Sequence, residues 1–139
     1  MEKALLDANV LVGAYRSDDE LHKKATAWVS NLKRKGWSFV STNLVIQETA
    51  TVLSMRVSMN LAKKFLKDQR NILDEEIFVD KQLETKSWEI FLRQTKKGTS
   101  FVDCSNLAAI EMYHLDGILS FDRFYPKELL VSPSDTLHN

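Results

Sequence analysis

Apolar residues recur along this chain at two different spacings, and segments of the two kinds alternate. The short apolar runs within "KALLD" (3–7) and "GILSF" (117–121) fit buried strands. Longer segments place apolar residues three and four positions apart, as with Leu21, Ala25 and Trp28, which predicts amphipathic helices. The predicted strands are residues 3–7, 37–41, 76–80, 117–121 and 129–132, and the predicted helices are residues 9–15, 20–36, 43–58, 59–70, 82–96 and 101–114. Strands that alternate with helices are typical of an α/β domain with a largely parallel sheet.

Polar residues and glycines mark the ends of these elements. Thr42 or Asn43 can cap the helix that starts there, while Gly36 and Gly98 are suited to ending the helices before them. No low-complexity linker and no internal repeat divides the sequence. With 139 residues, of which 44% are hydrophobic, we expect residues 1–139 to form a single domain.

The charges balance, which removes one simple guide to function. Lys plus Arg and Asp plus Glu each number 19, so the chain has no overall basic field that would indicate nucleic-acid binding. Its single cysteine, Cys104, excludes an intramolecular disulfide and fits a reducing compartment. The sequence shows no signal peptide and no apolar stretch of membrane-spanning length, so we expect a cytoplasmic protein without a membrane partner.

Two carboxylates stand where predicted strands end. Asp7 follows "ALL", and Asp122 follows "GILSF". If both strands run parallel, they deliver the two acids to the edge of the sheet at which open α/β folds bind ligands. An Asp after a strand can also simply cap the next helix, so neither position is decisive alone.

Two further acids occupy predicted helices. Glu48 shares a helical face with Leu44 and Val52, and a carboxylate in an apolar stripe is costly unless it is paired or binds a metal. Asp103 lies near the start of its helix, three residues after Ser100, as in a capping box. The alternatives are that a buried Arg pairs with Glu48 and that Asp103 serves only as a cap.

Together the four acids favour a metal site. Converging carboxylates raise each other's pKa unless a cation compensates their charge. Mg²⁺ and Mn²⁺ prefer oxygen ligands of this kind. Such ions can orient a phosphodiester, activate a water molecule and stabilise the leaving oxygen, so the pattern predicts metal-assisted hydrolysis.

The order and surroundings of these acids resemble the PIN domain family, most closely the small ribonucleases of the VapC toxin type. The resemblance is carried by "LLDANVLVGAY", "NLVIQETATVL" and, most strongly, "TSFVDCSNLAAIEMYHLDGILSFDRFY". It covers nearly the whole chain. For the fold, it implies a three-layer α/β/α sandwich around a central, mostly parallel sheet of four to five strands.

The resemblance also implies roles for the acids. The family's acidic positions match Asp7, Glu48, Asp103 and Asp122. The three aspartates would coordinate Mg²⁺ or Mn²⁺, and Glu48 would bind a second ion or orient the attacking water. The implied activity is metal-dependent cleavage of RNA that leaves a 5′-phosphate and a 3′-hydroxyl. Family members are frequently homodimers, and the toxins pair with a protein antitoxin.

Polar residues beside the acids have competing interpretations. Asn9 matches a family position that supports the metal or its waters, or it caps the helix that follows. Ser120 is placed to hydrogen-bond a carboxylate at the same edge. Arg123 is either a contact for phosphate or an ordinary surface residue, and Asp116 is assigned to a turn.

Residues that could hold RNA are less distinctive. Short basic clusters at 23–24, 33–35, 63–67 and 96–97 are either solvated helix faces or phosphate contacts beside the acids. Trp28, Trp37 and Trp88 are expected in the core, with base stacking as the less favoured interpretation.

Two other functions compete with ribonuclease activity. Phosphatases of the haloacid-dehalogenase type also place an Asp at the end of the first strand, but they need a second Asp where this chain has Asn9. Receiver domains need a later phosphoryl-accepting Asp and a Lys that cannot be placed here. A non-catalytic PIN-like module that binds RNA or protein is the other alternative, and it is disfavoured because a scaffold has no reason to keep converging charge.

Overall fold

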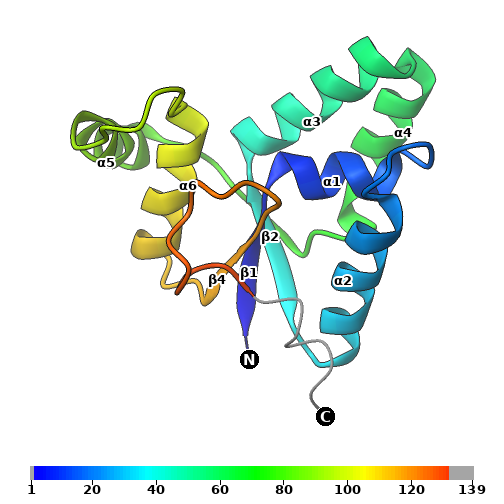
Figure 1. The fold of residues 1–139 in the computed structure, drawn as a ribbon, viewed down its shortest axis with the longest axis horizontal. Coiled ribbons are helices and arrows are strands. Elements are labelled where there is room, and N and C mark those ends of the chain that lie inside the picture. Colours follow the sequence, from blue (N-terminus) through cyan, green and yellow to red (C-terminus); the bar gives the residue numbers. More distant parts are fainter. Residues whose placement is uncertain (1, 132–139) are drawn as a thin grey trace.

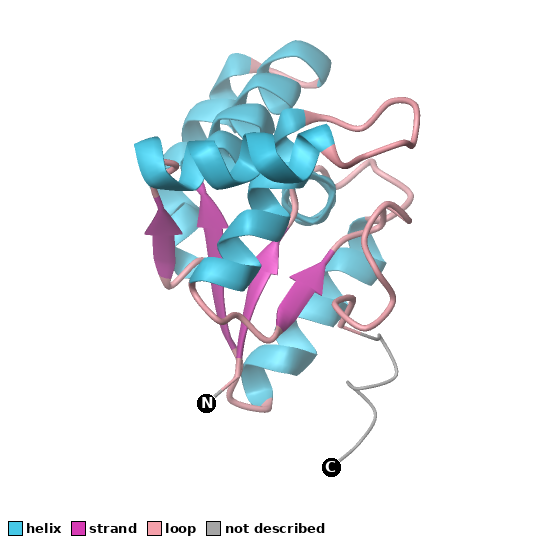
Figure 2. Cartoon of the chain, turned by 90° about the vertical axis from the view of Figure 1, so that its left-hand side faces the viewer, coloured by secondary structure: helices cyan, strands magenta, loops and turns pink. Residues whose placement is uncertain are grey.

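The computed structural model of the chain describes residues 2–131, which form four strands and six α-helices. The strands are β1 (Lys3–Leu6), β2 (Ser38–Thr42), β3 (Glu75–Ile77) and β4 (Gly117–Leu119), and the helices are α1 (Ala8–Tyr15), α2 (His22–Arg34), α3 (Asn43–Arg56), α4 (Met59–Asp68), α5 (Lys81–Leu92) and α6 (Phe101–Met112), with a 3-10 turn at Gln69–Asn71. The strands form one sheet in the order β3-β2-β1-β4, and every pairing is parallel (Figure 2).

Helices cover both faces of this sheet. Side chains of a strand alternate between faces, so a strand buried on both sides reads as a continuous apolar run. In β1, Ala4 and Leu6 pack in the core shared with α1 to α4, whereas Leu5 packs in the core shared with α5 and α6. Figure 1 shows these two groups of helices on opposite sides of the strands. The three-layer α/β/α fold with a parallel central sheet is therefore confirmed.

Several helix ends follow their predicted signals, and others do not. The Thr42 side chain accepts a hydrogen bond from the backbone N–H of Val45 at 3.2 Å, and Gly36, with φ of +93°, follows α2. Helix α5 ends at Leu92 instead of residue 96, and Gly98 lies in the loop beyond it with φ of +92°. Helix α6 stops at Met112 because a left-handed residue, His114 (φ 53°), reverses the chain before β4. No helix in the described part of the chain is long and apolar enough to cross a membrane.

The predicted strand at 129–132 is wrong in its described part. Only one bridge forms, between Ile118 and Leu130. The preceding residues are held in tight turns, with the N–H of Leu129 donating to the carbonyl of Pro126 at 3.0 Å and that of Leu130 to Lys127 at 3.2 Å. Among the described residues this segment pairs with β4 only at Ile118, whose N–H donates to Leu129 at 2.8 Å and whose carbonyl accepts the N–H of Val131 at 3.0 Å. Residue 132 lies outside the described residues.

The tryptophans divide between core and surface. Trp28 is 6% exposed and Trp37 is partly buried against the same core. Trp88 is 45% exposed, so its predicted core position is wrong. The buried residues of α5 are Leu83, Ser87 and Ile90, and Trp88 lies just outside that face, where its ring packs on Phe101 with centroids 4.3 Å apart.

Candidate metal and active site

Asp7 lies at the carboxyl end of the central strand β1. Strand register sets Leu6 opposite Leu119 of β4, so the next residues on the two strands, Asp7 and Ser120, are neighbours. The Asp7 side chain is the N-cap of α1, with Oδ1 accepting the N–H of Ala8 at 2.9 Å. Its Oδ2 accepts the hydroxyl of Ser120 at 2.8 Å. Asp7 is only 7% exposed, so the cap and the strand together hold a nearly buried carboxylate.

Ser120 connects Asp7 to the segment that carries Asp122. The Ser120 hydroxyl oxygen accepts the backbone N–H of Asp122 at 3.0 Å and the side-chain amide of Asn9 at 3.3 Å. Asn9 also accepts the N–H of Phe121 at 3.1 Å through its amide oxygen. Since Asp7 caps α1, Asn9 does not have that role, and it instead ties the first turn of α1 to residues 120–121.

Asp103 both caps its helix and faces Asp7. A capping box joins it to Ser100: the N–H of Asp103 donates to the Ser100 hydroxyl at 3.0 Å, and the N–H of Ser100 donates to Asp103 Oδ2 at 3.1 Å. The other carboxylate oxygen, Oδ1, lies 3.3 Å from the hydroxyl of Tyr125. That hydroxyl is also 3.3 Å from Asp7 Oδ2, so one group bridges the two acids.

Glu48 does not lie in an apolar stripe, and that expectation is wrong. The buried positions of α3 are Val45, Ile46, Thr49 and Leu53, and Glu48 projects from the exposed face beside them. Periodicity misassigned the face because apolar Leu44 and Val52 are only partly buried. Loss of solvent around its carboxylate, followed by the negative charges of Asp7 and Asp103, still raises the pKa of Glu48. The side chain therefore shares an electrostatic environment with both aspartates.

Asp122 is exposed just beyond β4. Its Oδ1 accepts the N–H of Phe124 at 3.0 Å, which turns the carboxylate toward its own loop. Arg123 is also exposed. Asp116 accepts the N–H of Lys3 at 2.8 Å at the opposite, amino end of the sheet, far along β1 from Asp7.

Two residues of this network, Asn106 and Tyr125, do not follow from the sequence reasoning. Asn106 is fully buried and its amide nitrogen donates to Tyr125 at 3.0 Å and to Asp7 Oδ1 at 3.4 Å. Tyr125 is 3% exposed. A signal for Asn106 exists, since a polar residue three positions after Asp103 shares its helical face within the otherwise apolar "NLAAI". Tyr125 gives no such signal, because the pattern around an aromatic residue in a predicted loop indicates only that its ring packs in the core.

Within the described part of the chain, no basic side chain forms an ion pair with the acids of this site. Burial is the main cause that raises the pKa of Asp7, and the charge of Asp103 adds to it, against hydrogen bonds from Ser120 and Ala8 that lower it. The ion pairs among residues 2–131 join Lys3 to Glu75, Arg16 to Asp18 and Lys86 to Glu111, and none involves the four candidate acids. A bound cation would relieve this repulsion.

The oxygen atoms of the candidate acids suit a hard divalent cation, although the acids are not close enough together to coordinate one ion. All candidate ligands are carboxylate oxygens, the type that Mg²⁺ and Mn²⁺ prefer. The amide oxygen of Asn106 is buried with no hydrogen-bond partner, which adds one more unused oxygen beside Asp7. Within residues 2–131, however, no three His, Cys, Asp or Glu side chains are grouped closely enough to hold an ion. Asp122 and Asp103 instead each accept a hydrogen bond from a nearby backbone N–H through one carboxylate oxygen.

The raised pKa values predict that the metal-free protein loses stability as pH rises. An acid whose pKa is higher in the folded state binds more protons when the protein is folded. Its contribution to the free energy of unfolding is therefore complete below the unfolded-state pKa and is lost as the pH rises through the folded-state pKa. The ordinary values are 3.8 for Asp7 and 4.5 for Glu48, and both are raised. In chelator, we expect the free energy of unfolding of Asp7→Asn, relative to wild type, to increase as the pH is raised from about 4 to neutrality. Denaturant melts across this range measure it, and a difference independent of pH would contradict the assignment.

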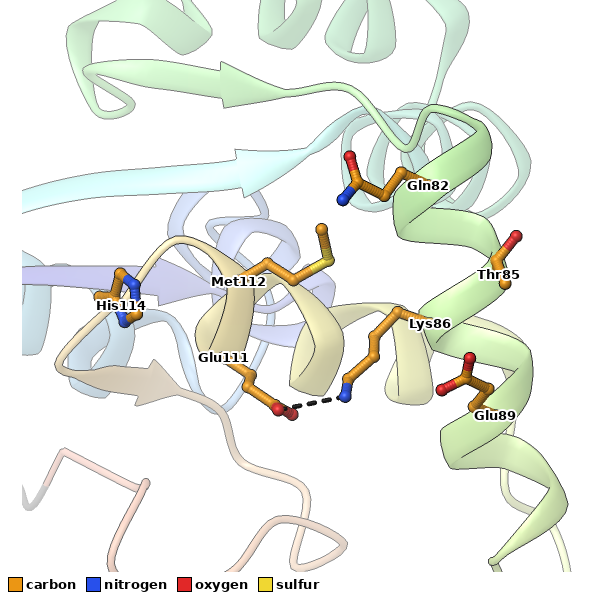
Figure 3. Close-up of a pocket in the computed structure, with 7 residues that line it drawn as sticks. All are labelled: Gln82, Thr85, Lys86, Glu89, Glu111, Met112 and His114. Atoms are coloured by element: carbon orange, nitrogen blue, oxygen red, sulfur yellow. Dashed lines mark ion pairs between the residues drawn. The ribbon is translucent and has the colours of Figure 1, made fainter.

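A separate groove lies between α5 and α6. It is lined by Gln82, Thr85, Lys86, Glu89, Glu111, Met112 and His114 (Figure 3). Lys86 and Glu111 pair across it at 3.1 Å. None of the four candidate acids lines this groove, so it is not part of the acidic site.

Comparison with known proteins shows which fold and which family the chain shares. The structure is similar to the crystal structure of Mycobacterium tuberculosis VapC20, a sarcin-ricin loop cleaving toxin, with a TM-score of 0.74 and 21% sequence identity over 86% of this chain and 89% of that chain. At this identity the likeness shows a shared fold. No curated protein matches the chain in sequence. The sequence profile of the PIN domain matches residues 4–126. Because that match spans most of the chain, the protein belongs to the PIN domain family.

Proposed function

We propose that this protein is a Mg²⁺- or Mn²⁺-dependent endoribonuclease. The observation that carries the proposal is that Asp7 and Asp103, from separate elements, lie close enough for one hydroxyl, that of Tyr125, to contact both at 3.3 Å. Burial, and then the charges of these two aspartates, raise the pKa of Glu48 as well. A site that concentrates negative charge cannot attract a phosphodiester until a cation neutralises it. Membership of a family of nucleases makes RNA cleavage the activity that best fits these groups.

Each residue has a role in this proposal. Asp7, Asp103 and Asp122 would hold the ion, and Glu48 would hold a second ion or orient the attacking water. When bound, the cation would polarise the phosphoryl oxygens and lower the pKa of a bound water. Asn9 and Ser120 keep the Asp7 and Asp122 segments together through their hydrogen bonds. Arg123, exposed beside Asp122, is available to contact phosphate.

The proposal extends to a toxin of a type II toxin–antitoxin pair. The similarity in fold to VapC20, which is a toxin, supports this role. The partners would be an RNA substrate, a protein antitoxin and a second copy of the chain in a homodimer, all in the cytoplasm. A reading frame for a small DNA-binding type of protein immediately upstream would support the antitoxin, and size-exclusion chromatography with light scattering would test the dimer.

Glu48→Gln tests the site with little risk to the fold. Because Glu48 is exposed and makes none of the ion pairs among residues 2–131, the variant should melt close to wild type. RNA cleavage should fall by about 10-fold or more, since partners of bound metals typically account for 10–100-fold. Cleavage of a labelled RNA is measured against Mn²⁺ concentration, with chelator as the blank.

The matched control is Glu89→Gln. Glu89 is also an exposed glutamate on a helix, but it lies in the groove of α5 and α6. It should cleave RNA as wild type does. A wild-type protein that binds RNA or a protein partner without cleaving RNA at any Mn²⁺ concentration would favour the non-catalytic module instead.

A further inference from the structure

We propose that Tyr125, oriented by Asn106, is a positioning residue that holds Asp7 and Asp103 together for the metal ion. The inference rests on the proposed function and adds two residues to its site. It starts from one observation: a single buried hydroxyl lies 3.3 Å from Asp7 Oδ2 and 3.3 Å from Asp103 Oδ1.

The hydrogen-bonding capacity of a phenol explains why Asn106 is needed. The hydroxyl has one proton to donate and can accept through its oxygen. The amide nitrogen of Asn106 donates to that oxygen at 3.0 Å, so the Tyr125 proton is directed toward the carboxylates. The same amide nitrogen lies 3.4 Å from Asp7 Oδ1. Asn106 and Tyr125 therefore contact both oxygens of Asp7, one each.

The bridge has a rigid support independent of the acids. Tyr125 is 3% exposed and belongs to the core formed with α5 and α6, and its ring packs edge-on against Phe124 with centroids 5.1 Å apart. Asn106 is fixed in the buried face of α6. Packing thus determines where the hydroxyl lies, and the hydroxyl determines how closely two like charges are held in the absence of a cation.

Both residues act through carboxylates and not on the substrate. Asp7 comes from the end of β1 and Asp103 from the first turn of α6, two elements that are distant in sequence. Other contacts fix each carboxylate separately, and the Tyr125 hydroxyl adds a donor whose single proton is shared between their facing oxygens and offsets their repulsion. A pair held in advance loses less conformational freedom when the ion binds, so its affinity for the ion is higher.

Tyr125→Phe removes the hydroxyl and keeps the ring. We expect the affinity for Mn²⁺, measured by calorimetry on the full chain without RNA, to fall by about 10–100-fold, the range for residues that orient metal ligands. Circular dichroism at the same temperature verifies that the variant is folded. Tyr113→Phe, an exposed tyrosine that follows α6, is the matched control and should bind Mn²⁺ as wild type does.

A double-mutant cycle separates positioning from packing. In chelator, Tyr125→Phe should lower the melting temperature less in an Asp103→Asn background than in wild type, because a hydrogen bond to a charged acceptor is the stronger one. Equal losses in both backgrounds, or unchanged Mn²⁺ affinity in a folded Tyr125→Phe protein, would overturn the inference while leaving the proposed function intact. A wild-type protein that bound no Mn²⁺ would instead refute the proposed function, and the inference with it.

Discussion

Asp7→Asn is expected to abolish metal-dependent RNA cleavage while the chain remains folded. Asp7 is the most buried of the four acids, and its two oxygens meet groups from α1, from α6 and from the segment after β4. Under the proposed function, the substitution removes the charge of the most buried metal ligand. The loss should exceed about 100-fold, the upper range for residues that only support a metal ligand. Cleavage rates at saturating Mn²⁺ and at low Mn²⁺ measure it.

The control for this variant is Asp116→Asn. Asp116 also accepts a backbone N–H beside β1, but at the amino end of the strand. It should keep wild-type cleavage. In chelator, Asp7→Asn should fold as wild type does, as judged by circular dichroism, because it removes one of several mutually repelling charges. A variant that still cleaved RNA with wild-type Mn²⁺ affinity would show that Asp7 is not a metal ligand.

Gly117→Ala is expected to lower the free energy of unfolding strongly, because it disturbs the packing of the fold. A Cβ at Gly117, the first residue of β4, would collide with the carbonyl oxygen of Leu129 and approach a methyl group of Val131 at 3.1 Å. That carbonyl cannot move away freely, because it accepts the N–H of Ile118 at 2.8 Å. We expect a loss of about 3 kcal/mol in the free energy of unfolding, as for overpacking against a fixed backbone. Urea melts of the two proteins measure it.

The Cβ would displace the segment around Leu129, which follows Tyr125 closely in the chain. Gly117→Ala should therefore shift the Tyr125 hydroxyl and also weaken Mn²⁺ binding. Gly36→Ala is the comparison: its φ of +93° is unfavourable for alanine, but nothing lies within 4 Å of the added Cβ. Gly36→Ala should lower the free energy of unfolding by about 1–2 kcal/mol, because alanine is strained in the left-handed conformation, and it should leave the Mn²⁺ affinity unchanged. A Gly117→Ala protein as stable as wild type would mean that the Leu129 segment does not pack on β4 as described.

The main elements could be predicted from the sequence because their periodicity records burial. Strand β1 is apolar at every position that two helical layers cover, and α2 shows its buried residues at helical spacing. Predictions failed where local and tertiary signals differ. The apolar "LLVS" predicts a strand, yet its described residues, 129–131, form a single bridge after turns at Pro126 and Lys127. Trp88 and Glu48 each lie one position off the buried face of a helix.

The class of fold, the family and the candidate acids could be inferred from the sequence. These three properties depend on the local spacing and the types of residues, and both can be seen directly in the sequence. Which acids meet, and by what contacts, depends on tertiary structure, because the bridge from Tyr125 to Asp7 spans 118 positions and that from Asn106 to Asp7 spans 99. Parallel strand register brings those positions to one edge of the sheet. The hydrogen bonds that orient the carboxylates exist only after the register is set, so no local pattern records them.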